Sequence, residues 1–483
     1  MSEQLLIGWG EADITPLDRP VSLAGQYYLR ISKGIHSHIK TVALVLQKGD
    51  QQAVMIEMDT VSIGSTQELM RPIIHEAIPE IREESIFVNC IHTHSAPNPR
   101  KGARINSQWE SAPEGTVTPD EFIDLLKERI LQAVKHAWQN RQPGGVARAF
   151  GNARIGHCRR PIFADGIAEM YGNTTREDFI GLEAGEDSGV EMLFTFDTAS
   201  KPTGMILNIA CPSQVMESTY VISSDYMGAS RELLKGEFGQ DFHTLCQISA
   251  AGCQSPRDLT RAYKTEPDFW HEDGVPVLAN RVLKAVQEAF PQTNGKIDFD
   301  PVFKHNCADC TLPMRRVTYP QYVAAQKELA RLLAIQGEQE AFEDFARVTH
   351  ENEKIPGRPG PYDNKLMHFV LIKNQQAIVK RYETQDETPT FTYPMQTLRI
   401  GDIAMVNCPW ELYLVFGQII KARTKAPQTF IVQLSGKGAG GYLPSPIAEK
   451  VAGYGGMIIN GTVGADGGFK LADIAVERLN ALF

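Results

Sequence analysis

Long apolar segments are missing from this 483-residue chain, and no apolar run approaches the ~20 residues of a membrane-spanning helix. The first residues, MSEQLLIGWGEADITP, contain neither a basic region nor a long apolar region, so we expect no secretory signal. Eight cysteines are scattered along the chain, and without such a signal they are expected to be reduced thiols. Together these absences favour a cytoplasmic protein.

A concentrated basic surface is also missing. The chain has 48 Lys and Arg against 58 Asp and Glu, a formal net charge of -10, and its charged stretches mix both signs. Because binding to phosphate backbones requires a clustered basic face, nucleic acid is excluded as the main partner. The oligomeric state stays open, a homo-oligomer included. Hydrophobic residues make up 42% of the chain, which is sufficient for a large buried core.

Strand and helix patterns alternate along the chain. Residues 41–63 are typical of a hairpin that turns at Gly49-Asp50, and residues 85–92 of a short buried strand. The clearest helix follows Thr118, its expected N-cap, and opens with Pro119. The pattern predicts an α/β fold with mixed β-sheets flanked by helices. Further strands are expected at 146–156, 190–197, 204–211, 243–252, 368–382, 395–409 and 429–436, and further helices at 65–78, 275–290, 320–352 and 468–482.

We expect residues 1–483 to form a single domain, because no composition shift, repeat or low-complexity tract divides them. The long polar helix pattern at 320–352 leads into a loop rich in Pro and Gly at 353–364. This loop is typical of a boundary or of a flexible segment over a cleft. We interpret residues 320–362 as a helical insertion.

The sequence VNCIHTHSAP, residues 88–97, places two of only 12 histidines at the end of a predicted strand. Side chains two residues apart on an extended segment point to the same side. His92 and His94 can therefore bind one metal ion together, or serve as one ligand and one general base. The alternative is two ordinary histidines in a turn.

Other predicted strands also end abruptly in small and polar residues. In open α/β folds functional groups gather beyond strand ends, so these segments are candidates for one shared site. They bring Cys211, Ser213, Gln214 and Glu217 after one strand, Cys253, Gln254, Ser255, Arg257 and Asp258 after another, Glu411 and Tyr442 near the end of the chain, and the pair Arg159 and Arg160 in between.

These segments, taken in their order along the chain, resemble the N-terminal catalytic domain of the neutral/alkaline non-lysosomal ceramidase family. The His-Thr-His-Ser block at 92–95 and the Gly-x-x-Ser-Pro block at 252–256 are the most specific. The resemblance covers nearly the whole chain. It implies that the chain has the fold of the ceramidase catalytic domain. The other matching segments are GWGEADITP, GIHSHIKTVALVL, NIACPSQVMESTYVISSDY, LRIGDIAMVNCPWE and GGYLPS.

The resemblance implies a zinc-dependent amidohydrolase. It implies zinc ligands at His92, Glu411 and Tyr442, with His94 as a proton-handling group. Ser255 matches a serine proposed to take part in amide cleavage, and Arg159 or Arg160 matches an arginine that contacts the reacting group. In that mechanism zinc activates a water molecule, His94 accepts its proton, and Arg160 or Ser255 stabilises the oxyanion.

Four features depart from the family pattern. The second zinc-binding histidine is absent, and Cys211 stands in the matching stretch, where a thiolate is a possible substitute ligand. The family's Gly-Asp has become Gly252-Cys253, the chain ends where ceramidases continue into a β-sandwich domain, and no export signal is present. We therefore expect a divergent cytosolic subgroup whose substrate is a small or lipid-like amide other than ceramide.

Two alternatives remain open at this point. One is a different enzyme on the same fold, acting on a small polar sugar-like or ester substrate. The other is a non-catalytic binding protein that has lost its metal ion. Buried charges such as Glu411 and the Arg159-Arg160 pair cost several kcal/mol unless they are paired, which favours an enzyme over a scaffold.

Overall fold

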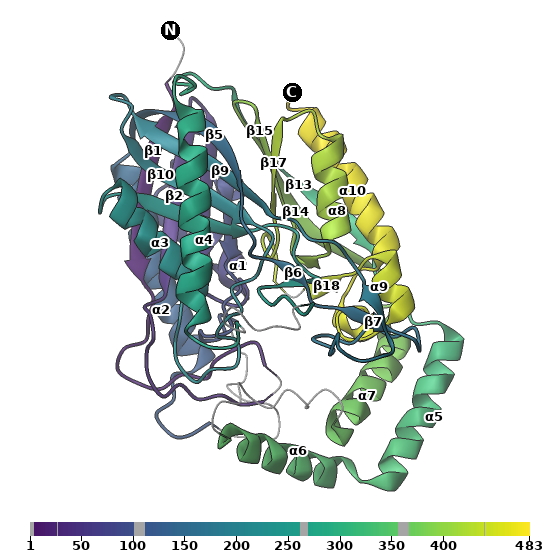
Figure 1. The fold of residues 1–483 in the computed structure, drawn as a ribbon. Helices are drawn as coiled ribbons and strands as arrows, with labels where there is room; N and C mark the ends of the chain where they lie inside the picture. Colours follow the sequence, from purple (N-terminus) through teal and green to yellow (C-terminus); the bar gives the residue numbers. More distant parts are fainter. Residues whose placement is uncertain (1–3, 27, 101–111, 261–268, 356–366, 439) are drawn as a thin grey trace.

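The computed structural model contains two β-sheets packed face to face, with helices on both outer faces (Figure 1). It describes residues 4–26, 28–100, 112–260, 269–355, 367–438 and 440–483. The larger sheet has eight strands in the order β11-β10-β9-β5-β1-β2-β3-β4, and the smaller has four in the order β13-β14-β15-β17. The expected mixed α/β fold is confirmed.

The bounds of the elements are as follows. The large sheet contains β1 (Leu6–Asp13), β2 (Lys40–Lys48), β3 (Gln51–Met58), β4 (Ile86–Cys90), β5 (Gln142–Asn152), β9 (Gly189–Asp197), β10 (Pro202–Ile209) and β11 (His243–Ile248). The small sheet contains β13 (Phe303–Pro313), β14 (Thr390–Ile400), β15 (Ile403–Asn407) and β17 (Gln428–Val432). Short pairs are formed by β6 (His157–Cys158) with β12 (Gln254–Ser255), β7 (Pro161–Phe163) with β8 (Phe179–Leu182), and β16 (Glu411–Leu412) with β18 (Tyr442–Leu443). The helices are α1 (Thr66–Ala77), α2 (Pro119–Gln139), α3 (Asp225–Phe238), α4 (Gly274–Ala289), α5 (Tyr319–Ile335), α6 (Glu338–Glu353), α7 (His368–Thr384), α8 (Leu414–Arg423), α9 (Pro446–Val451) and α10 (Ala465–Asn480).

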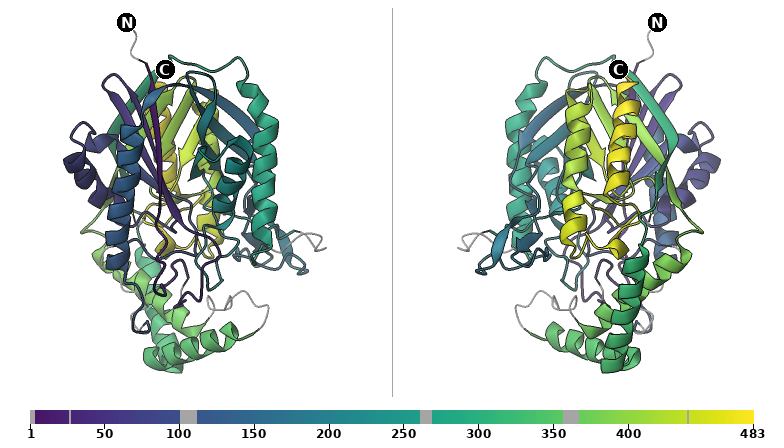
Figure 2. Two further views of the ribbon diagram at one scale, coloured as in Figure 1. Left: turned by 90° about the vertical axis from the view of Figure 1, so that its left-hand side faces the viewer. Right: turned by 90° about the vertical axis from the view of Figure 1, so that its right-hand side faces the viewer.

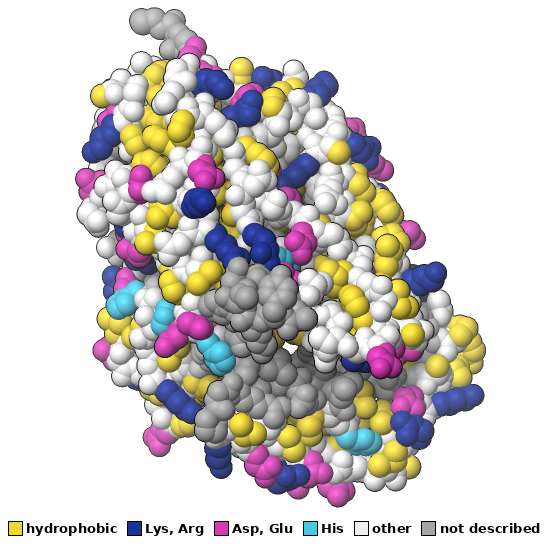
Figure 3. All heavy atoms as spheres, in the orientation of Figure 1, with side chains coloured by type: hydrophobic (Ala, Val, Ile, Leu, Met, Phe, Trp, Pro, Cys, Tyr) yellow, Lys and Arg dark blue, Asp and Glu magenta, His cyan; other side chains and the backbone are white. Residues whose placement is uncertain are grey.

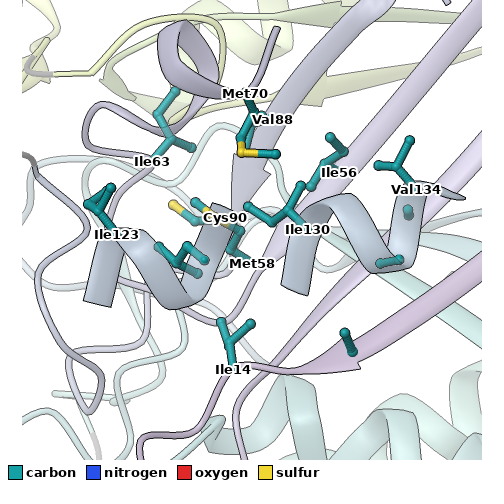
Figure 4. Close-up of a cluster of buried hydrophobic side chains, with 14 of the residues drawn as sticks. Ile14, Ile56, Met58, Ile63, Met70, Val88, Cys90, Ile123, Ile130 and Val134 are labelled. Atoms are coloured by element: carbon teal, nitrogen blue, oxygen red, sulfur yellow. The ribbon is translucent and has the colours of Figure 1, made fainter. Parts of the chain in front are cut away.

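Four clusters of buried hydrophobic side chains hold the sheets and their covering helices together. One cluster joins the two sheets and includes Trp9 and Met55 from the large sheet with Phe430 and Met405 from the small one. A second lies between α1, α2 and the large sheet, where Ile130 and its neighbours point inward (Figure 4). Two further clusters lie under α3 and α4 and under α8 and α10. Helices α1 to α4, α8 and α10 thus cover the outer sheet faces, which leaves the sheet ends for other groups.

Helices α5, α6 and α7 extend away from the sheets, below the strand ends in the orientation of Figure 2. They have a small core of their own, which includes Phe342, Phe345 and Phe369, and Tyr28 of the main body packs into it. The interpretation of residues 320–362 as a helical insertion, and of the chain as one domain, stays a prediction. Most of the loop expected at 353–364 lies outside the described residues.

Two element predictions in this region are wrong. The single helix expected at 320–352 is two helices, because Gln336 adopts an extended conformation after α5 and Gly337 caps α6. Residues 368–382, expected as a strand, form α7. Short apolar runs do not separate a strand from a buried helix by periodicity alone, and here Phe369, Val370 and Ile372 are buried in the core of the three-helix segment.

The hairpin at Gly49-Asp50 and the helix that opens with Pro119 after the N-cap Thr118 are confirmed. On the face drawn in Figure 3, basic and acidic side chains are interspersed over most of the surface. No helix among the described residues is long and apolar enough to cross a bilayer.

The N-terminus of α2 gives a test of this fold. Thr118 Oγ1 accepts a hydrogen bond from the Glu121 N–H at 3.2 Å, and the Thr118 N–H donates to the Glu121 carboxylate at 2.7 Å. Replacing Thr118 by Ala removes one of these bonds and should lower the free energy of unfolding by ~1 kcal/mol. Urea unfolding measures the loss. Replacing the exposed Lys135 of the same helix by Ala should change it by less than ~0.5 kcal/mol, and an equal loss in both variants would contradict this assignment.

Candidate active site

The candidate site lies where strand ends of both sheets meet. The parallel pairs β3/β4, β10/β11 and β15/β17 place the carboxyl ends of their strands on common sheet edges. The loops after them are joined through the backbone, because the Ser213 N–H donates to Ile91 O at 3.2 Å and the Gly252 N–H to Leu412 O at 2.8 Å. A Cβ atom at Gly252 would lie 2.4 Å from Glu411 O, so only glycine permits this approach. Several of the strand-end segments predicted to share a site therefore do meet: the loop after β10 contacts the one after β4, and the loop after β11 contacts the segment of Glu411.

His92 and His94 face each other just beyond β4. Their rings are nearly perpendicular and their Nε2 atoms lie 3.3 Å apart. His92 has φ of 61°, the left-handed region that costs a non-glycine residue on the order of 1–3 kcal/mol. Its Nδ1 contacts Val61 O at 2.5 Å, and because a carbonyl only accepts, Nδ1 carries a proton. The Nε2 atom of His92 is therefore the one that faces the site.

Gln214 fixes the protonation of His94. Arg159 Nη1 donates to Gln214 Oε1 at 3.2 Å, so the other end of the amide, Nε2, is the donor that lies 2.9 Å from His94 Nε2. His94 Nε2 is thus an acceptor, and the proton of a neutral ring lies on Nδ1, which is 3.8 Å from Glu217 Oε2. Burial lowers the pKa of His94 well below its usual value, and the charges of His92 and nearby arginines lower it further. His94 is neutral at pH 7.

Glu411 completes the group around His92. Its Oε2 lies 3.5 Å from His92 Nε2. His92 Nε2 therefore has two acceptors nearby, the carboxylate and His94 Nε2. A lone pair on His92 Nε2 would repel both neighbours, whereas a proton there makes the contact with the carboxylate favourable, since Gln214 already uses the lone pair of His94 Nε2. We therefore assign one proton shared between His92 and Glu411.

Arg159 is the central cation. The residue is 2% exposed. Its Nη2 contacts Tyr442 Oη at 3.0 Å, Gly252 O at 3.0 Å and Glu411 Oε2 at 3.4 Å. Burial alone would lower the pKa of Arg159, but Tyr442, Tyr171 and Glu411 raise it well above its usual value. Burial also raises the pKa of Tyr442 well above normal, although Arg159 opposes the shift, so the hydroxyl keeps its proton.

A second buried arginine borders the site. Arg257 pairs with Glu217 at 3.1 Å and donates to Gln214 O at 2.7 Å. Its guanidinium lies over the Trp270 ring, 3.2 Å from the centroid, and its Nη1 lies 3.3 Å from Tyr171 Oη. Arg257 therefore fixes the loop that carries Gln214 and Glu217.

Of the residues expected in the site, the structure brings together His92, His94, Arg159, Glu411 and Tyr442. Arg160 is used elsewhere: it pairs with the buried Glu183 and donates to the carbonyls of Ala452 and Tyr454. Arg160 therefore supports the 452–456 turn. The oxyanion role expected for it belongs to another group.

Ser255 and Cys211 also have other surroundings. Ser255 Oγ accepts a hydrogen bond from the Arg257 N–H at 3.2 Å and so shapes the loop of Arg257. Cys211 lies in the hydrophobic cluster under α3 and α4, with its Sγ 3.5 Å from Ile155 O. Burial raises the pKa of the Cys211 thiol far above normal, which disfavours the thiolate that a zinc ligand requires.

These residues do not fit a zinc ion held by His92, Glu411, Tyr442 and Cys211. Glu411 and Tyr442 are both bound by the Arg159 guanidinium, and the Cys211 thiol belongs to the core. Within the described ranges, no three His, Cys, Asp or Glu side chains are grouped so as to hold a metal ion. We derive no catalytic step through zinc.

Comparison with known proteins supports the fold. No family model and no curated protein matches this chain. The crystal structure of neutral ceramidase from Pseudomonas aeruginosa superposes with a TM-score of 0.68 at 16% identity, over 100% of this chain and 75% of that one. A ceramidase complexed with C2 superposes with a TM-score of 0.67 at 15% identity, over 99% and 75%. This chain has the neutral ceramidase fold. The expected ceramidase-like fold is thereby confirmed, whereas the cytosolic subgroup stays a prediction.

Sequence reasoning gave no role to Gln214, Glu217 or Arg257, although all three were among the polar residues at strand ends. Charge would have selected two of them, because burial beyond a strand end requires Glu217 and Arg257 to pair. Tyr171 was missed altogether. It comes from the irregular segment after β7, and its neighbours in the sequence carry no motif.

The buried, neutral His94 predicts a pH dependence of stability. Its pKa is near ~6.5 in the unfolded chain and lower in the folded protein, so below pH ~6.5 the unfolded state binds more protons. The stability present above that pH is therefore lost on acidification. Urea unfolding at pH 7 and pH 5.5 should show a smaller loss for His94→Gln than for the wild type. The exposed His136→Gln serves as the control, and equal losses in all three proteins would contradict the assignment.

Proposed function

We propose that this protein is a hydrolase that cleaves the C–N bond of an amide, with an N-acylated amine other than ceramide as its substrate. The observation that carries this proposal is the contact of His92 Nε2 with Glu411 Oε2 at 3.5 Å, inside a group of buried polar side chains at the strand ends. Two proteins of this fold are described as ceramidases, which supports an amide over other acyl substrates. Glu411 is the more accessible of the pair, with its side chain 13% exposed.

The residues have distinct roles in this proposal. Glu411 accepts a proton from a water molecule as the water oxygen attacks the carbonyl carbon. Tyr442 Oη accepts an Arg159 N–H and its own O–H is hydrogen-bonded to Glu411 in the resting site. In this proposal the hydroxyl turns from Glu411 to the carbonyl oxygen as negative charge develops there. This assigns to Tyr442 the stabilising role that the sequence suggested for Arg160 or Ser255.

Breakdown of the tetrahedral intermediate uses the other proton. His92 donates its Nε2 proton to the leaving nitrogen as the C–N bond breaks, which gives a carboxylic acid and an amine. The proton held by Glu411 then returns to His92 Nε2 across the 3.5 Å contact, and the starting state is restored. Gln214 occupies the lone pair of His94, so His94 positions His92 rather than accepting the water proton.

The variants His92→Ala and Glu411→Gln test this proposal. Each should lower kcat/KM for release of a free amine from N-acyl substrates by at least ~100-fold, because general acid–base catalysis contributes about 10²–10⁴-fold. The panel should contain N-acyl sphingoid bases, short N-acyl amines, N-acyl amino sugars and the matching esters. The control is Glu128→Gln, an exposed residue of α2, which should keep full activity.

The panel also separates the alternatives. Amine release that persists in both site variants would contradict the assigned roles. Cleavage of esters alone would overturn the amide assignment, and binding of an N-acyl amine without turnover would overturn the assignment as an enzyme.

A further inference from the structure

Arg159 lies among oxygens that come from five separate segments of the chain, one of which carries Tyr171, whose hydroxyl is hydrogen-bonded to Arg159. Its two terminal nitrogens contact Gln214 Oε1 after β10, Gly252 O after β11, Glu411 Oε2 on β16 and Tyr442 Oη on β18. Convergence of a carboxylate, two phenols, an amide and a carbonyl on one buried point is an arrangement that selects a cation. Here the cation is a side chain of the same protein, and its planar fork matches several acceptors at once.

The charged groups around the histidine pair already carry more positive than negative charge without a metal ion. Arg30 donates to His94 O at 2.6 Å, and Arg159 and Arg257 border the same histidine pair. The carboxylates that face these three guanidinium groups are Glu217 and Glu411. A divalent cation in contact with Glu411 would therefore lie against an excess of buried positive charge.

Gln214 also occupies atoms that a metal site would need. Its amide reaches both Arg159 and His94 Nε2, and so it uses the lone pair by which that histidine would bind a metal ion. Cys211, the residue expected to replace the missing histidine, is in the core instead. An amide that accepts from a guanidinium and donates to an imidazole is suited to a site whose cation is an arginine.

We propose that the guanidinium of Arg159, supported by Gln214, takes the place of a catalytic metal ion, and that this protein works without one. Arg159 holds Glu411 and Tyr442 in position and compensates the negative charge that develops on the substrate oxygen through Tyr442. The catalytic part of this inference rests on the proposed function, whereas the part about metal binding does not.

The test measures zinc in protein purified without a histidine tag, dialysed first against zinc and then against buffer. Wild type should retain no stoichiometric zinc. Arg159→Ala frees Glu411 and Tyr442 beside His92 and should gain zinc, which the double variant Arg159→Ala/His92→Ala should lose again. Arg159→Lys keeps a cation and should stay free of zinc. The control Arg148→Ala removes an arginine paired with Asp402 and should behave as wild type.

Stoichiometric zinc in the wild type that is lost in His92→Ala would overturn the inference, and this measurement does not depend on whether Arg159→Ala folds. A folded Arg159→Ala, verified by circular dichroism, that takes up no zinc would also overturn it. Amide hydrolysis by the wild type should persist in the presence of a chelator. If the panel of substrates shows no hydrolysis at all, the proposed function fails while the zinc content still decides the metal question.

Discussion

The contact between the Arg159 guanidinium and Glu411 is the interaction on which the candidate site depends. It joins a residue that follows β6 to a residue on β16, and through Tyr442 and Gln214 it fixes the loops on either side. Removing one partner of a buried ion pair leaves an uncompensated charge, which costs ~3–5 kcal/mol. The loops at the strand ends therefore keep one geometry, and that geometry presents His92 Nε2 to the Glu411 carboxylate.

The remainder of the fold serves to bring these loops together. Two sheets packed through one apolar layer place the ends of β4, β10, β11, β15 and β17 near one another, and the outer helices bury the opposite sheet faces. Glycine at 252 permits the close approach of one loop to Glu411, and Gly25 does the same for His94, since a Cβ there would lie 2.4 Å from the ring. Packing and backbone contacts thus fix the positions of the loops that carry the catalytic groups.

Much of this arrangement follows from the sequence. Apolar runs predicted most of the strands, though not the helix α7, and Thr118 and Pro119 predicted the start of α2. The resemblance of the ordered strand-end motifs to the ceramidase family implied the fold. The roles of Cys211 and Gln214 did not follow, because a difference of three residues after a strand decides which side chain enters the core. Likewise, neighbouring arginines look equivalent in sequence, yet Arg159 binds Glu411 and Arg160 binds Glu183. Long-range pairing of this kind is visible only in three dimensions.

The central claim is that a buried guanidinium, rather than a metal ion, is the cation beside His92 and Glu411. A crystal structure of protein purified in the presence of zinc, with anomalous diffraction recorded above the zinc absorption edge, tests it most directly. The account predicts no anomalous peak at the histidine pair and continuous density for Arg159 in contact with Glu411 and Tyr442. A peak between His92 and Glu411, with Arg159 turned away from both oxygens, would contradict it.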